Sequence, residues 1–245
     1  MNSVATAVTF TVPEISWAAL APILCVLGGG ILAVLAESFV PVRARRSSVI
    51  GIALVALIAS AVALVMRWAV VTVTPSSLGE YIDDPLTIAA QGILVLIAFF
   101  AVLVIADRSE AGDGAFAGQP SDRPGSSDEE RSDAEGYQRS EMFALVLFST
   151  GGMMIFPAAN SYIALFVALE VMSLPLYILA ATARRRRQLS QEAALKYFIL
   201  GAFSSGFMLM GSAFLYGYSG SLIISDAATP TPQTAGMHVL LLMGT

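Results

Sequence analysis

Charged residues are distributed very unevenly along this 245-residue chain. The 35 residues from Asp107 to Glu141 hold 14 of its 31 charged side chains. The other 210 residues share 17 charges, about 8% of positions, against roughly 25% in a typical soluble domain. A water-soluble surface needs more charge than this. The charge distribution therefore excludes a soluble globular enzyme and predicts a polytopic membrane protein.

Six apolar runs are long enough to cross about 30 Å of hydrocarbon, which takes about 20 residues per helix. An all-α fold is predicted, a transmembrane bundle of six complete spans plus the start of a seventh. Because no basic residue precedes Arg43, the first run lacks the basic segment of a cleaved signal peptide. The predicted helices are Trp17–Ala36, Val49–Met66, Pro85–Ala106, Met142–Phe156, Asn160–Thr182 and Ala193–Tyr216, followed by a run that begins at Met237.

The basic residues predict the orientation of the bundle. Eleven of the 13 follow the first, third or fifth span, and the exceptions are Arg67 and Lys196. By the positive-inside rule these three loops are cytoplasmic and the N-terminus lies outside. The segment 107–141 carries 10 acidic residues and is rich in Ser and Gly, so it is predicted to be a disordered acidic cytoplasmic loop. It separates a three-helix part, 1–106, from a second part, 142–245.

Several kinds of chemistry are excluded by residue counts. One cysteine, Cys25, excludes an internal disulfide and a cysteine-ligated cluster, and one histidine, His238, excludes a bis-histidine haem. No phosphate-binding glycine motif is present, and no extended basic surface suits nucleic acid. We therefore expect neither a cofactor site nor a metal site on this chain.

Glu170 is the first candidate functional residue, because it lies near the middle of the fifth predicted helix. A charged carboxylate there costs several kcal/mol unless it is paired, hydrated or protonated. Ser173 and Tyr177 follow on the same face, and Pro175 frees the backbone carbonyl of Val171. This pattern favours a role in proton or ion handling over a neutral carboxyl that only bonds to a neighbouring helix.

Lys196 is the second candidate, one to two turns inside the sixth predicted helix. Two interpretations stay open: a lysine whose side chain extends toward the membrane–water interface, or a base that handles protons. Glu192, four residues earlier, is placed to form an ion pair with it. Function is favoured by the fact that every other basic residue of the chain is arginine, because lysine loses its proton far more readily.

The residues around these candidates resemble a known family. LEVMSLPLY and EAALKYFILGAFSS, within 168–222, and EMFALVLFSTGGMMI, at 141–155, closely resemble the antiporter-like subunit N of the proton-pumping NADH-quinone oxidoreductase, respiratory complex I. The resemblance implies the first part of an inverted-repeat fold. In that fold a glutamate and a lysine on the fifth and sixth helices serve proton translocation, and Glu170 and Lys196 match those positions. Family members run to roughly twice this length.

The resemblance implies a function in the membrane arm of that complex, coupling electron transfer from NADH to quinone to proton translocation. It also implies that NADH, FMN, iron–sulfur clusters and quinone are bound by partner subunits. The expected partners are other membrane-arm subunits, the lipid bilayer and, indirectly, the quinone pool, in a bacterial plasma membrane. A cation/proton antiporter subunit of the same superfamily and a non-pumping structural element of the arm remain as alternatives.

Overall fold

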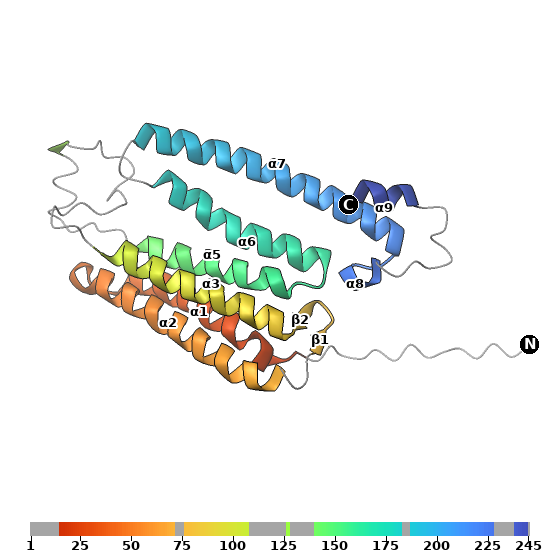
Figure 1. The fold of residues 1–245 in the computed structure, drawn as a ribbon. Helices are drawn as coiled ribbons and strands as arrows, with labels where there is room; N and C mark the ends of the chain where they lie inside the picture. The colour runs from red at the N-terminus through yellow and green to blue at the C-terminus, as the bar shows by residue number, and fades with distance from the viewer. Residues whose placement is uncertain are drawn as a thin grey trace, which may run out of the picture.

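The computed structural model describes residues 15–71, 76–107, 126–127, 140–182, 187–227 and 238–244. Within these ranges the chain is a helix bundle with one short β-hairpin (Figure 1). The long helices are α1 (Trp17–Phe39), α2 (Val42–Val71), α3 (Pro85–Ala106), α5 (Glu141–Ile155), α6 (Tyr162–Ala181) and α7 (Arg187–Ser219). The short elements are β1 (Ser76–Leu78), β2 (Tyr81–Asp83), the 3-10 helix η1 (Phe156–Ala158), α8 (Ile224–Ala227) and α9 (His238–Gly244).

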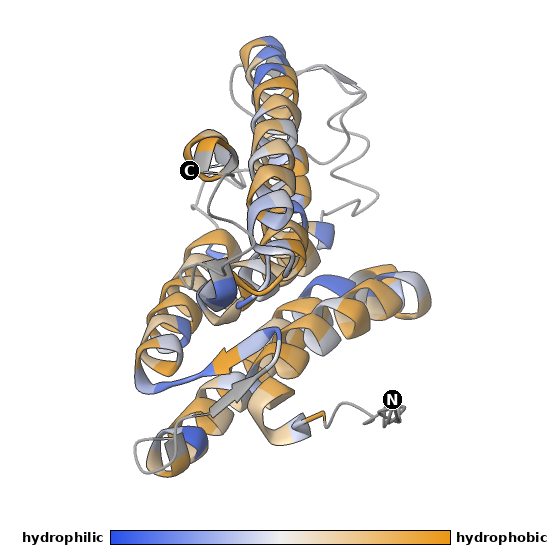
Figure 2. Cartoon of the chain, turned by 90° about the vertical axis from the view of Figure 1, so that its right-hand side faces the viewer, coloured by the Kyte–Doolittle hydropathy of each residue, from blue (hydrophilic) through white to orange (hydrophobic). Residues whose placement is uncertain are grey.

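In the part of the chain that the structure describes, six helices are long and apolar enough to cross a membrane, with α5 taken together with η1. Apolar residues cover most of the helical ribbon in Figure 2. The helix α9 begins one residue after the predicted start of a seventh span. The predicted fold class, an all-α transmembrane bundle with six spans and the start of a seventh, is confirmed. The hairpin β1–β2 is an addition that the sequence did not predict.

Three of the long helices begin at the end of the bundle that carries this hairpin, called here the hairpin end. The side chains of Ser16, Asp84 and Ser161 each accept a hydrogen bond from the backbone N–H three residues later, which caps α1, α3 and α6. Pro85 occupies the first turn of α3, where its missing N–H costs nothing. These caps fix the start of each helix at the hairpin end.

Three helices are longer than predicted, and α1 is the least extended of them, ending at Phe39 rather than Ala36. The helix α2 extends over Val42–Val71 rather than Val49–Met66, and α7 over Arg187–Ser219 rather than Ala193–Tyr216. The extra turns include polar and arginine-rich stretches, because a helix continues past the apolar run that reveals it. The predicted loop 107–141 lies outside the described residues except at 107, 126–127 and 140–141.

The helix α5 forms the centre of the packing and α7 its edge (Figure 1). Phe143 and Leu147 of α5 are fully buried against a core from α1, α2 and α3. In the span formed by α5 and η1, 56% of the residues are buried, against only 6% in the most apolar stretch of α7. The face of α5 at Gly152 lies against α6, where an added Cβ would be 2.4 Å from the backbone nitrogen of Met172. Only glycine permits this approach.

The hairpin end is tied together through Asn160. Its backbone N–H donates to the carbonyl of Glu80 at 2.8 Å, and its side chain donates to the carbonyl of Gly79 at 2.9 Å. The backbone N–H of Ile224 donates to the carbonyl of Asn160 at 2.9 Å. Gly79 has φ +62°, a left-handed conformation that glycine adopts without strain. The loops between α2 and α3, α5 and α6, and α7 and α8 therefore meet at one end.

The opposite end carries the arginines in the first turns of α2, and is called here the arginine end. Arg46 donates to the carbonyl of Ala106, the last residue of α3, at 3.0 Å. Glu37 pairs with Arg45 at 3.5 Å and accepts a hydrogen bond from the hydroxyl of Ser140. These contacts join the ends of α1 and α3 to the starts of α2 and α5.

Candidate functional site

Glu170 lies in the interior of α6, about 12 Å from Tyr162 and about 16 Å from Ala181 at a rise of about 1.5 Å per residue. Its side chain is half-buried. Among the described residues its carboxylate has no hydrogen bond and no ion pair. A carboxylate at this depth therefore needs water, a proton or a partner from outside the described residues.

The predicted polar stripe of α6 is present, and its members differ in their bonding. The hydroxyl of Ser173 is buried and donates to the carbonyl of Leu169 at 2.6 Å, so its proton is used within the helix. On the neighbouring face, the hydroxyl of Ser149 in α5 donates to the carbonyl of Met172 at 3.1 Å. Pro175 lies within α6 and is buried. The hydrogen bond from Ser149 thus holds the backbone of α6 two residues from Glu170 against α5.

Tyr177 is the member of the stripe that faces α7. Only 8% of its side chain is exposed. Its ring packs edge-on against Tyr197 and Phe198, with centroid distances of 4.7 and 5.6 Å. Its hydroxyl lies so close to Gly201 that an added Cβ there would be 1.8 Å from the oxygen. The absence of a side chain at Gly201 therefore makes room for the tyrosine hydroxyl.

Lys196 lies on α7 with 68% of its side chain exposed. Its ammonium forms the predicted ion pair with Glu192, one turn earlier, and the Glu192 side chain is 58% exposed. This pairing is confirmed. Lys196 and Glu170 form no ion pair with each other, so the structure puts the two candidates on neighbouring helices without joining them directly.

An ion pair at the hairpin end was not predicted. Arg67, at the end of α2, pairs with Asp83 of β2, whose side chain is 2% exposed. Arg67 was one of two exceptions to the distribution of basic residues along the sequence. That exception was the sequence feature that could have indicated an ion-pair partner for Arg67. Its charge is balanced by a buried carboxylate, so it does not act as a free positive charge on this side.

A buried amide and a phenol adjoin this pair. Gln91 of α3 is 1% exposed and donates to the carbonyl of Met154 at 2.9 Å and to the hydroxyl of Tyr81 at 3.3 Å. The Tyr81 hydroxyl donates to the carbonyl of Ala19 at 3.1 Å. Burial raises the pKa of Tyr81 above its ordinary value of 10.0. This polar cluster joins α1, α3, α5 and β2. It could have been predicted from the presence of a glutamine, Gln91, inside an apolar helix.

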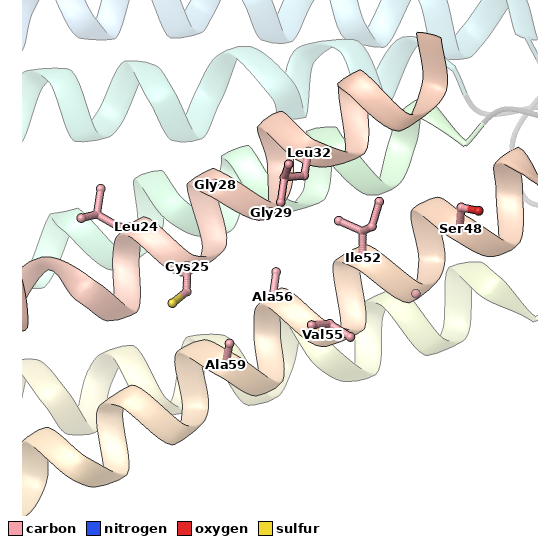
Figure 3. A pocket seen from close by; sticks show the side chains of 11 residues that line it. Leu24, Cys25, Gly28, Gly29, Leu32, Ser48, Ile52, Val55, Ala56 and Ala59 are labelled. Atoms are coloured by element: carbon pink, nitrogen blue, oxygen red, sulfur yellow. The ribbon is translucent and has the colours of Figure 1, made fainter. Parts of the chain in front are cut away.

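An apolar groove of about 600 Å³ lies between α1 and α2 (Figure 3). It is lined by Leu24, Cys25, Gly28, Ile52 and Ala56, among others, and contains no ionisable side chain other than the thiol of Cys25. It lies on helices that carry neither Glu170 nor Lys196. The groove therefore offers no route for protons between the two candidates.

The comparisons with known proteins bear on this arrangement of α6 and α7. Residues 159–244 match the family described as NADH:quinone oxidoreductase/Mrp antiporter, TM. NADH-quinone oxidoreductase subunit N of Beutenbergia cavernae is 49% identical over 96% of this chain. Subunit N of Saccharopolyspora erythraea is 46% identical over 95% of it. The resemblance to subunit N is confirmed.

The chain spans about half the length of these subunit N relatives, 46% in each case. The fold also matches a chain in the structure of respiratory complex I from Thermus thermophilus with bound aureothin. That match has a TM-score of 0.64 and 28% identity, and it covers 91% of this chain and 42% of the other. The bundle is thus similar to one part of a longer membrane subunit.

Proposed function

We propose that this chain is a membrane-arm subunit of a proton-translocating NADH:quinone oxidoreductase, and that it helps to couple electron transfer to proton translocation. The observation that carries the proposal is Glu170, a half-buried carboxylate in an apolar helix with no ion-pair partner among the described residues. Such a group is costly in a membrane and marks an ion or proton pathway more often than a packing site. The subunit N relatives add independent support.

In this proposal the two candidates perform acid–base chemistry. Glu170 carries or modulates a negative charge in the interior of the bundle. Lys196 exchanges a proton near the arginine end, where its ammonium forms an ion pair with the Glu192 carboxylate. Charge or conformational changes elsewhere in the complex drive these proton transfers.

Redox chemistry is assigned to partner subunits, which would bind NADH, FMN, iron–sulfur clusters and quinone. The one cysteine of this chain cannot ligate a cluster by itself. In the described part of the chain, no three His, Cys, Asp or Glu side chains are grouped as metal ligands. The proposed partners are neighbouring membrane-arm subunits and the lipid bilayer, with an indirect link to the quinone pool.

The proposed location is the bacterial plasma membrane, with the N-terminus and the hairpin end outside. Arg45 and Arg46, in the first turns of α2, lie at the end where α1 and α3 finish, as the positive-inside rule predicts for a cytoplasmic end. At the hairpin end, the charge of Arg67 is offset by Asp83.

A cation/proton antiporter subunit is the alternative, because the matching family description includes Mrp antiporters. Purification of the complete chain from native membranes separates the two. We expect NADH-oxidising iron–sulfur subunits to copurify, and proton transport to require NADH. Sodium-dependent proton flux without NADH would select the antiporter. Unchanged pumping stoichiometry after loss of both Glu170 and Lys196 would instead indicate a structural element.

A further inference from the structure

The apolar groove between α1 and α2 opens on the outside of the bundle and has no part in the proposed function (Figure 3). Two of its lining side chains, Leu32 and Val55, are 56% and 66% exposed, so the groove faces the surroundings of the bundle and not its core. The two helices meet at Gly29 and Ala56, which are too close for a Cβ on the glycine. The volume of about 600 Å³ is that of a small-ligand site. An apolar molecule of the membrane can therefore fill it.

The groove covers one half of the membrane span. Its wall on α2 extends from Ser48 to Ala59, about 16 Å at a rise of about 1.5 Å per residue. The apolar span of α2 is Ala44–Val70, so the groove occupies the half that is nearer the arginine end. One leaflet of hydrocarbon is about 15 Å thick, half of the full core of about 30 Å. This length suits one acyl chain, whereas a partner helix parallel to α2 would contact both halves of the span.

Positive charge is concentrated where the groove reaches the arginine end. Residues 42–48 include Arg43, Arg45 and Arg46 and no acidic residue. Arg45 precedes Ser48 by three residues, on the same face of α2. Its side chain is 28% exposed, pairs with Glu37 at 3.5 Å and donates to one backbone carbonyl at 3.4 Å. A guanidinium has five N–H donors, so donors remain for a ligand, and the three positive charges exceed the one negative charge of Glu37.

We propose that the groove binds an anionic phospholipid from the leaflet at the arginine end, with one acyl chain between α1 and α2 and the phosphate at Arg45. Basic pockets between membrane helices attract anionic headgroups in this way. The hydroxyl of Ser48, at the arginine end of the groove in Figure 3, is placed to donate to the same phosphate. The inference is independent of proton handling, because Glu170 and Lys196 lie on other helices.

Photoactivatable lipids test this site in the assembled complex. The detergent-washed complex is reconstituted into phosphatidylcholine vesicles that contain a small fraction of a probe with a diazirine in its acyl chain. The probe is either phosphatidylglycerol or phosphatidylcholine, and the labelled peptides are mapped after illumination. We expect labelling within residues 24–32 and 48–59. It should be about fivefold stronger with the phosphatidylglycerol probe, which is the contribution of one arginine at an anionic membrane surface.

Three variants separate charge from shape. Arg45→Gln should reduce labelling by the phosphatidylglycerol probe to that of the phosphatidylcholine probe, whereas Arg45→Lys keeps the charge and most of the preference. Gly51→Leu places a side chain in the groove, where a Cβ meets nothing within 4 Å, and should remove most labelling by both probes. Gly92→Leu is the matched control, because Gly92 of α3 is equally open but does not line the groove.

Three results would overturn the proposal. Equal labelling by the two probes in the wild-type complex would show that the anionic headgroup is not recognised. Wild-type labelling in Gly51→Leu would show that the acyl chain lies outside the groove. No labelling of the groove by either probe would show that another subunit covers it. Should Arg45→Gln fail to assemble, the comparison of Gly51→Leu with the wild type and with Gly92→Leu decides.

Discussion

Arg67 forms an ion pair with Asp83 at the hairpin end, joining the end of α2 to β2. Asp83 is almost fully buried and Arg67 is largely so, with side chains 2% and 18% exposed. Removal of one partner of such a pair leaves a buried charge uncompensated. Arg67, an exception to the distribution of basic residues, therefore links the last turns of α2 to the strand β2.

Replacement of Asp83 by asparagine should therefore destabilise the folded chain by about 3 kcal/mol, because Arg67 loses its counter-charge. Thermal unfolding of the purified complex in detergent measures this loss. Glu80→Gln is the control, since Glu80 is an exposed carboxylate on the same hairpin. Equal stability of the Asp83 and Glu80 variants would show that the ion pair contributes nothing.

Two glycines should respond in opposite directions to the same substitution. Gly152→Ala forces a Cβ to within 2.4 Å of the backbone nitrogen of Met172, so it should separate α5 from α6 and cost about 1–3 kcal/mol. Gly92→Ala in α3 meets nothing within 4 Å and should stabilise the helix by about 0.5–1 kcal/mol. Unfolding of both variants under identical conditions tests this, and a tolerated Gly152→Ala would contradict the observed packing.

The folding stability of the chain should depend on alkaline pH through Tyr81. Burial raises the pKa of its phenol above 10.0 in the folded state. Because the folded state holds the phenol proton more tightly than the unfolded state does, the contribution of Tyr81 to folding stability is complete below pH 10. That contribution is lost as pH rises through the folded-state pKa. Tyr81→Phe should be less stable at neutral pH, through loss of its bonds to Ala19 and Gln91, but should lose less stability above pH 10. Parallel pH curves for the two proteins would refute this.

The orientation is tested by two single cysteines in a chain with Cys25 replaced by serine. A cysteine at Ser126 should react with a membrane-impermeant reagent only from the cytoplasmic side. A cysteine at Ser76, in the hairpin, should react only from outside. Labelling of Ser126 from outside in intact cells would reverse the assignment of both ends.

Much of the fold was predictable because each membrane span is a long run of apolar residues that can be recognised in the sequence. Pro85–Ala106 was predicted to the residue, since Asp84 and Pro85 form a clear helix start and Asp107 ends the apolar run. The ends of α2 and α7 were not, because hydropathy marks the membrane-buried stretch and not the whole helix. The hairpin was missed because three-residue strands leave no periodic pattern.

The candidate site was predictable only in part. The Glu192–Lys196 pair follows from spacing along one helix, so the sequence was sufficient. The approach of Tyr177 to Gly201 depends on how α6 and α7 cross, and the Arg67–Asp83 pair on how a loop folds back. Contacts between elements are set by packing that no local pattern encodes.

The charge of Glu170 is the central claim. Glu170→Gln keeps the shape of the side chain and removes its charge, whereas Glu170→Asp keeps the charge on a shorter stem. A role in packing alone would reverse the order of their effects, with glutamine tolerated and aspartate harmful.

The decisive measurement is the membrane potential generated per NADH oxidised in these two variants, at matched abundance of the complex. We predict normal assembly and strongly impaired pumping in Glu170→Gln, with more activity retained in Glu170→Asp. Wild-type coupling in Glu170→Gln would contradict the charge-based role of Glu170.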